Sequence, residues 1–87
     1  MSERQVELSS LKNIGTTMAQ WLRDVGIHTP EELRAIGSVA AWRRVRSAYG
    51  NRVTIIGLYA LEGAIADVHW NALPEEIKSR LIQEAQM

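Results

Sequence analysis

The stretch VTIIGLYALEGAIA, residues 53–66, decides the fold because almost every position in it is apolar. With Val68 just beyond it, a helix over this stretch would have almost no polar face. A helix that is apolar all round is normally buried at the centre of a domain. The stretch is also shorter than a membrane span, which needs about 20 residues. We therefore predict a central buried helix over 53–66 and expect no membrane partner.

Two short helices are predicted ahead of the central one. Thr17 and Gln20 have the spacing of a capping box, and Gly26 stands where a left-handed residue would end the first helix. The second helix has a clearer start, because Thr29 offers an N-cap hydroxyl and Pro30 suits the first helical position.

A third helix is predicted between the second and the central one. Gly37 is expected to end the second helix near Ile36, and Ser38 is placed to cap the third. Gly50-Asn51 then breaks that third helix.

A last helix is expected from Pro74 to about Ala85, with Glu76 and Arg80 forming an i,i+4 pair on its exposed side. Strand-like alternation is not convincing anywhere in the chain. The pattern therefore predicts an all-α fold, a compact domain of five to six helices.

One pattern occurs twice, at an offset of 22 residues. Residues 11–19 read LKNIGTTMA and residues 33–41 read LRAIGSVAA, and both fit L-x-x-I-G-[ST]-x-x-A. This pattern is typical of a short helix, a glycine turn and a second helix, the arrangement of a helix-hairpin-helix unit. The turn of such a unit presents backbone N–H groups at the positive end of the helix dipole, where a phosphate oxygen can dock.

The two units differ at the third position of the pattern. Asn13 in the first tolerates left-handed geometry, whereas Ala35 in the second does so poorly. Phosphate docking is therefore better supported in the first unit. The alternative is that both units are compact helix-packing devices.

The charge of the chain is unevenly distributed. Residues 34–52 hold five arginines and no acid, although the net charge of the whole chain is zero. This balance argues against a uniformly basic nucleic-acid binder but leaves one basic stripe. Three interpretations of the stripe are open. It is a solvated face, it pairs with the acidic C-terminal helix of the same or another subunit, or it binds phosphate groups. The candidate phosphate contacts are Lys12, Asn13, Gly15, Thr16, Thr17, Arg34, Arg43, Arg44, Arg46 and Arg52.

Catalytic and metal-binding patterns are weak. The chain has no cysteine, which excludes disulfides and thiolate chemistry and fits a reducing cytoplasm. His28 and His69 are its two histidines, and Asp67 with His69 gives too few ligands for a metal site. Residues 1–5 are polar and do not open a signal peptide. We expect no metal, no cofactor and no small-molecule substrate.

Polar and aromatic residues of the helices have structural interpretations. Glu62 is the one charge in the central stretch, and an unpaired buried carboxylate would be costly. It should therefore either reach the surface or find a donor, for which an arginine of the basic stripe or a backbone N–H is a candidate. Structural hydrogen bonding is favoured over catalysis, because no motif places a second catalytic group near Glu62. Trp21, Trp42 and Trp70 fall on apolar helix faces, for which core packing is the default.

Several blocks follow one another in a recognisable order along residues 8–83. They are Leu11, Asn13 to Gly15, Trp21-Leu22, Val25 to Ile27, Thr29, Glu32 to Arg34, Ile36-Gly37, Val39, Ala41-Trp42, Leu58 to Ile65, Trp70, Leu73 and Pro74. This order resembles the C-terminal domain of the TfoX/Sxy family. The resemblance implies an all-helical domain with helix-hairpin-helix character and a link to natural competence. It also implies that full family members act as transcriptional coactivators alongside the cyclic-AMP receptor protein.

Those full members carry an additional N-terminal domain, for which 87 residues leave no room, so we expect a stand-alone domain. We predict one domain over 1–87, with a core over about 8–85 and two helix-hairpin-helix-like units packed on the central helix. The expected function is that of a non-enzymatic cytoplasmic regulator or adaptor that acts through a protein partner or self-association. The alternative is sequence-nonspecific nucleic-acid binding through the hairpin at Gly15 and the arginine stripe. The residues expected to be structural are Gly26, Thr29, Gly37, Glu62 and Trp70.

Overall fold

The computed structural model describes residues 7–86, which form five α-helices and three short 3-10 helices. In chain order these are η1 (Leu8–Ser10), α1 (Thr16–Asp24), α2 (Pro30–Ile36), α3 (Ser38–Tyr49), η2 (Gly50–Arg52), α4 (Ile55–Ala66), η3 (Trp70–Ala72) and α5 (Glu75–Ala85). No strand occurs within 7–86, so the predicted all-α fold is confirmed. The interpretation of residues 1–5 as free of a signal peptide lies outside the described residues.

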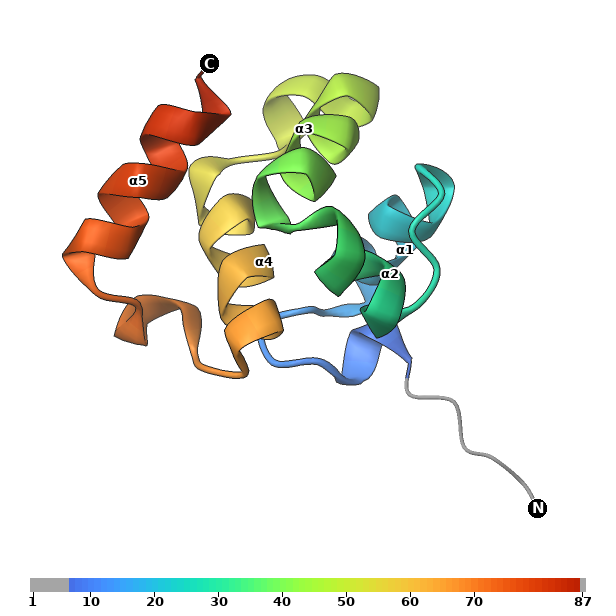
Figure 1. Ribbon diagram of the computed structural model, residues 1–87. Coiled ribbons are helices and arrows are strands. Elements are labelled where there is room, and N and C mark those ends of the chain that lie inside the picture. Colours follow the sequence, from blue (N-terminus) through green and yellow to red (C-terminus); the bar gives the residue numbers. More distant parts are fainter. Residues whose placement is uncertain (1–6, 87) are drawn as a thin grey trace.

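The predicted central helix corresponds to α4, which lies between α5 on one side and α2 and α3 on the other (Figure 1). Leu58 and Leu61 are fully buried in it, and the core continues through leucines and isoleucines of the other helices. The helix begins at Ile55 rather than Val53, because Thr54 is extended and serves as its N-cap. Its burial is also incomplete, since Ile56 remains 43% exposed.

Two of the predicted helix boundaries are confirmed in detail. Gly26 has φ +92° and donates its N–H to the Arg23 carbonyl at 3.0 Å, while the Ile27 N–H reaches the Leu22 carbonyl at 2.9 Å. These two bonds form the Schellman motif that closes α1. At the start of α2, the Thr29 hydroxyl accepts the Glu32 N–H at 3.1 Å. Gly26 and Thr29 are therefore structural residues, as predicted.

Two other predicted caps are wrong. The N-cap of α1 is Gly15, so Thr17 is already helical and no side chain caps this helix. The Gln20 amide instead donates to Asp24 at 2.8 Å. Ser38 does not cap α3 either, because Gly37, with φ +87°, both ends α2 and precedes α3. Ser38 is thus the first helical residue, and its hydroxyl is available for a different contact.

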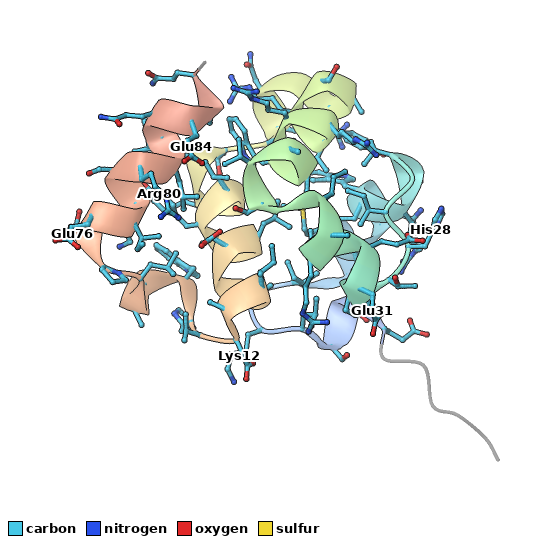
Figure 2. The ribbon with its side chains drawn as sticks, viewed as in Figure 1. Lys12, His28, Glu31, Glu76, Arg80 and Glu84 are labelled. Atoms are coloured by element: carbon cyan, nitrogen blue, oxygen red, sulfur yellow. The ribbon has the colours of Figure 1, made fainter. Side chains whose placement is uncertain are left out.

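The last helix packs against α3 and α4 through Leu81, which is 1% exposed. It begins at Glu75, one residue after the extended Pro74. The predicted Glu76–Arg80 pair is wrong: Figure 2 shows Glu76 pointing away from the body of the molecule. Arg80 lies 3.7 Å from a carboxylate oxygen of Glu84 and 3.9 Å from one of Glu62, so its side chain extends toward α4.

Candidate functional site

The two repeat units differ in structure. The second is a full helical hairpin, in which Gly37 alone joins α2 to α3. In the first, the expected leading helix is only the single 3-10 turn η1, and an irregular turn leads from there to α1. The prediction of a helix, a turn and a helix is therefore correct for the second unit and wrong for the front of the first.

Asn13 in the first unit adopts the left-handed conformation that its residue type allows, with φ +71°. Its side chain turns inward rather than toward a ligand. The amide donates to the carbonyls of Val68 at 2.9 Å and Ala60 at 3.4 Å, and its oxygen accepts the Trp70 N–H at 3.1 Å. The Asn13 side chain, one of the candidate phosphate contacts, therefore bonds within the chain and joins the first turn to the α4–η3 connection.

The start of α1 remains accessible. Gly15, Thr16 and Thr17 are exposed, and the N-cap residue makes no side-chain hydrogen bond to the first N–H groups of the helix. Lys12 lies 3.8 Å from Asp67, the left-handed residue that ends α4. Figure 2 shows Lys12 at this end of α4.

The second unit is tied to the centre of the molecule through Ser38. Its hydroxyl, on a residue that is 5% exposed, donates to Glu62 at 2.7 Å. Glu62 is also approached by Arg80 of α5, so it finds donors as expected, but they are Ser38 and Arg80 rather than an arginine of the basic stripe or a backbone N–H. The reason is spatial: Glu62 lies on the side of α4 that meets both Ser38 and α5. Its role is to hold α3, α4 and α5 together.

The arginine stripe is largely engaged in contacts within the chain. Arg43 donates to the carbonyls of Glu84 and Ala85 at the end of α5. Arg46 donates to the Val53 carbonyl at 3.3 Å and lies 5.3 Å from the centre of the Trp42 ring. The interpretation in which the stripe meets the C-terminal helix of the same chain therefore describes Arg43.

The remaining stripe residues are more peripheral. Arg52 lies over the Tyr49 ring, 5.7 Å from its centre, while Arg34 on α2 and Arg44 on α3 are exposed. The candidate contacts do not form one cluster. Lys12 lies at the end of α4, whereas Arg46 lies beside its start. Because the 12 residues of α4 span about 18 Å, the two cations are far apart.

A groove with apolar side chains in its lining lies between α3, the start of α4 and the end of α5. This α3–α5 groove has a volume of about 520 Å³. Its main lining residues are Trp42, Arg43, Arg46, Ile55, Ile82 and Ala85. A second hollow of about 530 Å³ lies at Gly37 and contains Glu62, Glu84 and Arg80. Arg43 lines both. Sequence reasoning missed the α3–α5 groove because its walls come from three helices whose packing no local pattern specifies.

The aromatic residues support helix packing. Trp42 is 7% exposed, and its ring nitrogen donates to the Thr54 carbonyl at 2.9 Å. Trp21 stacks on Tyr49 with ring centres 4.9 Å apart. Trp70, half-buried at the start of η3, stacks on Tyr59 with ring centres 6.3 Å apart.

One titratable pair lies next to the Trp21–Tyr49 stack. The Tyr49 hydroxyl donates to the Asp24 carboxylate. This bond, supported by one from Gln20, lowers the pKa of Asp24 below its usual value. The same bond raises the pKa of Tyr49. Both pKa shifts favour an ionised Asp24 beside a protonated Tyr49, and the hydrogen bond between them joins the end of α1 to the end of α3.

Other chemistry is sparse in the part of the chain that the structure describes. His69 acts as an N-cap, accepting the Asn71 N–H at 3.3 Å, and His28 is exposed. Residues 7–86 contain no group of three or more His, Asp or Glu side chains arranged to hold a metal ion. No helix in this range has the length and hydropathy needed to cross a bilayer.

These features define a small helical domain built from one full hairpin and one partial hairpin around a buried helix. The chain belongs to the TfoX C-terminal domain family, whose model matches residues 4–85. It is 29% identical over 83 residues to the DNA transformation protein TfoX1 of Aliivibrio fischeri. That match covers 95% of this chain but 40% of TfoX1.

Two solved structures are also similar. An uncharacterised protein from Listeria monocytogenes, in a triclinic crystal form, is 40% identical, with a TM-score of 0.86 over 93% of this chain and 91% of that one. A Listeria monocytogenes protein of unknown function, in a tetragonal form, is 39% identical, with a TM-score of 0.80 over 91% of this chain and 96% of that one. The predicted family resemblance is confirmed.

Proposed function

We propose that this domain is a non-enzymatic regulatory module that acts by binding another protein, in a process related to DNA transformation. Its family and its similarity to TfoX1 support the link to transformation. The observation that carries the proposal is a contrast between two parts of the surface, the arginine stripe and the α3–α5 groove. Arg43 and Arg46 of the basic stripe bond within the chain, whereas the α3–α5 groove leaves apolar side chains open to a partner.

Glu62 supports the non-enzymatic part of the proposal. Its carboxylate is shared between Ser38 and Arg80, so its environment is that of a structural link between helices. General acid–base catalysis needs a group positioned toward a substrate. The Glu62 carboxylate instead contacts side chains of α3 and α5.

The proposal is tested by domain exchange. The segment of TfoX1 that matches this chain is replaced by residues 4–85 of this protein, and transformants of Aliivibrio fischeri are counted. We expect the chimera to retain transformation above the level of a TfoX1 deletion. A matched chimera with Leu61→Asp, which unfolds the core, serves as the negative control. A folded chimera that performs no better than the deletion contradicts the proposed function.

Nucleic-acid binding is the second candidate, favoured by the exposed start of α1 and by exposed Arg34 and Arg44. Duplex DNA is titrated at several salt concentrations, with heparin as a second polyanion. Phosphate contacts would give an affinity that falls steeply with salt. We expect no affinity for duplex beyond that for heparin. A steep salt dependence that Arg34→Gln and Arg44→Gln flatten would replace the protein-binding proposal with this alternative.

A further inference from the structure

The α3–α5 groove offers an apolar surface in a recess of suitable size. Trp42 is buried beside it, and Ile55 and Ile82, from two different helices, are half-buried. Its volume of about 520 Å³ lies within the range of sites that take up ligand side chains. The groove can therefore receive large apolar side chains without a rearrangement of the core.

Its charge has one sign. Within the described part of the chain, the charged residues that line it are Arg43 and Arg46, and no carboxylate does so. The Val53 carbonyl takes one of the five N–H donors of Arg46, and the guanidinium lies over Trp42. A guanidinium that lines the groove can donate to a carboxylate of a ligand seated against the apolar wall.

The second hollow, at Gly37, lacks this combination. It holds the carboxylates of Glu62 and Glu84, which lie beside Arg80, so an acidic ligand would meet carboxylates there. Of the two recesses, the α3–α5 groove is therefore the one that matches an acidic and apolar ligand.

A second copy of this chain is a poor occupant of the groove. A stable dimer buries about 800 Å² on each partner, which is roughly 15% of the surface of this molecule. Among residues 7–86, the large hydrophobic side chains that are exposed are Ile56 and Val68, and neither lines the groove. A short segment with one or two apolar anchors needs far less surface.

We propose that the α3–α5 groove binds an acidic amphipathic segment of a partner protein. An apolar anchor of that segment packs between Ile55 and Ile82, and an adjacent carboxylate accepts hydrogen bonds from Arg46. The proposal rests on the proposed function and names the chemistry of the partner that this function requires.

The first test identifies the ligand chemistry without a known partner. A phage-displayed library of 12-residue peptides is selected on the immobilised full chain. We expect the enriched peptides to share a bulky apolar residue next to Asp or Glu. Enrichment of basic peptides, or no enrichment over bare support, would overturn the proposal.

The second test locates the bound peptide on the unmodified protein. The three tryptophans give separate indole N–H signals in a ¹H–¹⁵N spectrum, and Trp42 is the one that lines the groove. We expect titration with the most enriched peptide to shift the Trp42 signal more than those of Trp21 and Trp70. Shifts confined to Trp21 or Trp70 would place the site elsewhere and reject the groove.

A matched pair of variants then tests the charge. Arg46→Gln removes a groove arginine, whereas Arg44→Gln removes the same charge from the same helix outside the groove. We expect Arg46→Gln to weaken the Kd about fivefold or more and Arg44→Gln to change it less than about twofold. Circular dichroism confirms that both variants are folded. Equal losses in the two variants contradict the groove assignment.

These results separate the two proposals. Peptides that bind outside the groove reject the groove while leaving a protein-binding function in place. A salt-dependent affinity for duplex DNA, with no peptide enriched, rejects both. A change from dimer to monomer in Arg46→Gln, measured by sedimentation, would show that a second copy occupies the groove and would overturn the proposed partner.

Discussion

The two repeat units share one sequence pattern but differ in what comes before the glycine. In the second unit, Thr29 and Pro30 stand just ahead of the pattern, and they start a helix that runs to Ile36. The first unit has no such start, and Asn13 turns the chain by a left-handed step. The residues that the two units share therefore specify the glycine turn and the helix after it. The residues before the pattern decide whether a first helix forms.

The units also differ in how they attach to α4. The first attaches through the Asn13 side chain, which bonds to three backbone groups around the end of α4. The second attaches through Ser38, which bonds to the Glu62 side chain in the middle of α4. Because the two attachments use different residues, each can be broken separately by substitution.

Gly63→Ala should break the attachment of the first unit. An added Cβ would lie 2.5 Å from the Asn13 amide nitrogen and 2.7 Å from the Val68 carbonyl oxygen, so the Asn13 side chain must move. Overpacking costs about 1–3 kcal/mol, and buried groups left without partners add to it. We expect a total loss of about 2–4 kcal/mol in the free energy of unfolding, measured by urea denaturation.

Gly57→Ala is the control for that change on the same helix. Its added Cβ would meet the flexible end of Met18 at 3.2 Å, and alanine favours a helix over glycine by about 0.5–1 kcal/mol. This variant should be neutral or slightly stabilising. If both alanines destabilise equally, the Asn13 attachment is not what Gly63 accommodates.

Asn13→Ala tests the left-handed turn together with the three hydrogen bonds. Alanine at φ +71° costs about 1–2 kcal/mol, and the lost bonds add about 1 kcal/mol. We expect a loss of about 2–3 kcal/mol by thermal or urea denaturation. Asn13→Gly keeps the turn and should recover about half of it. Equal losses in the two variants would mean that the backbone conformation contributes nothing.

How much of this the sequence could predict follows from the range of each interaction. The end of α1 and the start of α2 were predictable, because the hydrogen bonds made at Gly26 and Thr29 join residues no more than five apart in the chain. The buried helix was predictable from composition alone. Arg80 beside Glu62, and Arg43 at the end of α5, depend on how distant helices pack, which no local spacing encodes.

Asn13 is an intermediate case between local and long-range interactions. Its tolerance for left-handed geometry was visible in the sequence, and the structure has that conformation. The destination of its side chain was not visible, because Val68 and Trp70 lie more than fifty residues away.

Gly37→Ala and Gly15→Ala compare the glycines of the two units directly. Gly37 has φ +87°, where an alanine is strained, whereas Gly15 has φ −89° and open space around an added Cβ. Both precede a helix, so any loss of N-cap preference is shared. We expect Gly37→Ala to lower the free energy of unfolding by about 1–2 kcal/mol more than Gly15→Ala. Equal values in urea denaturation would contradict the assigned turn geometries.

Thr29→Ala and Thr17→Ala contrast the side-chain cap of α2 with a residue of α1 that only has capping-box spacing. The Thr29 hydroxyl accepts the Glu32 N–H, so its removal should cost about 0.5–2 kcal/mol. Thr17 is exposed within the first turn of α1, and its replacement should change stability by less than about 0.5 kcal/mol. Thr29→Ser keeps the acceptor and should be nearly neutral in the same denaturation assay. If serine at position 29 is as damaging as alanine, the methyl group of Thr29, and not its hydroxyl, stabilises the start of α2. The difference between the two units would then be one of packing.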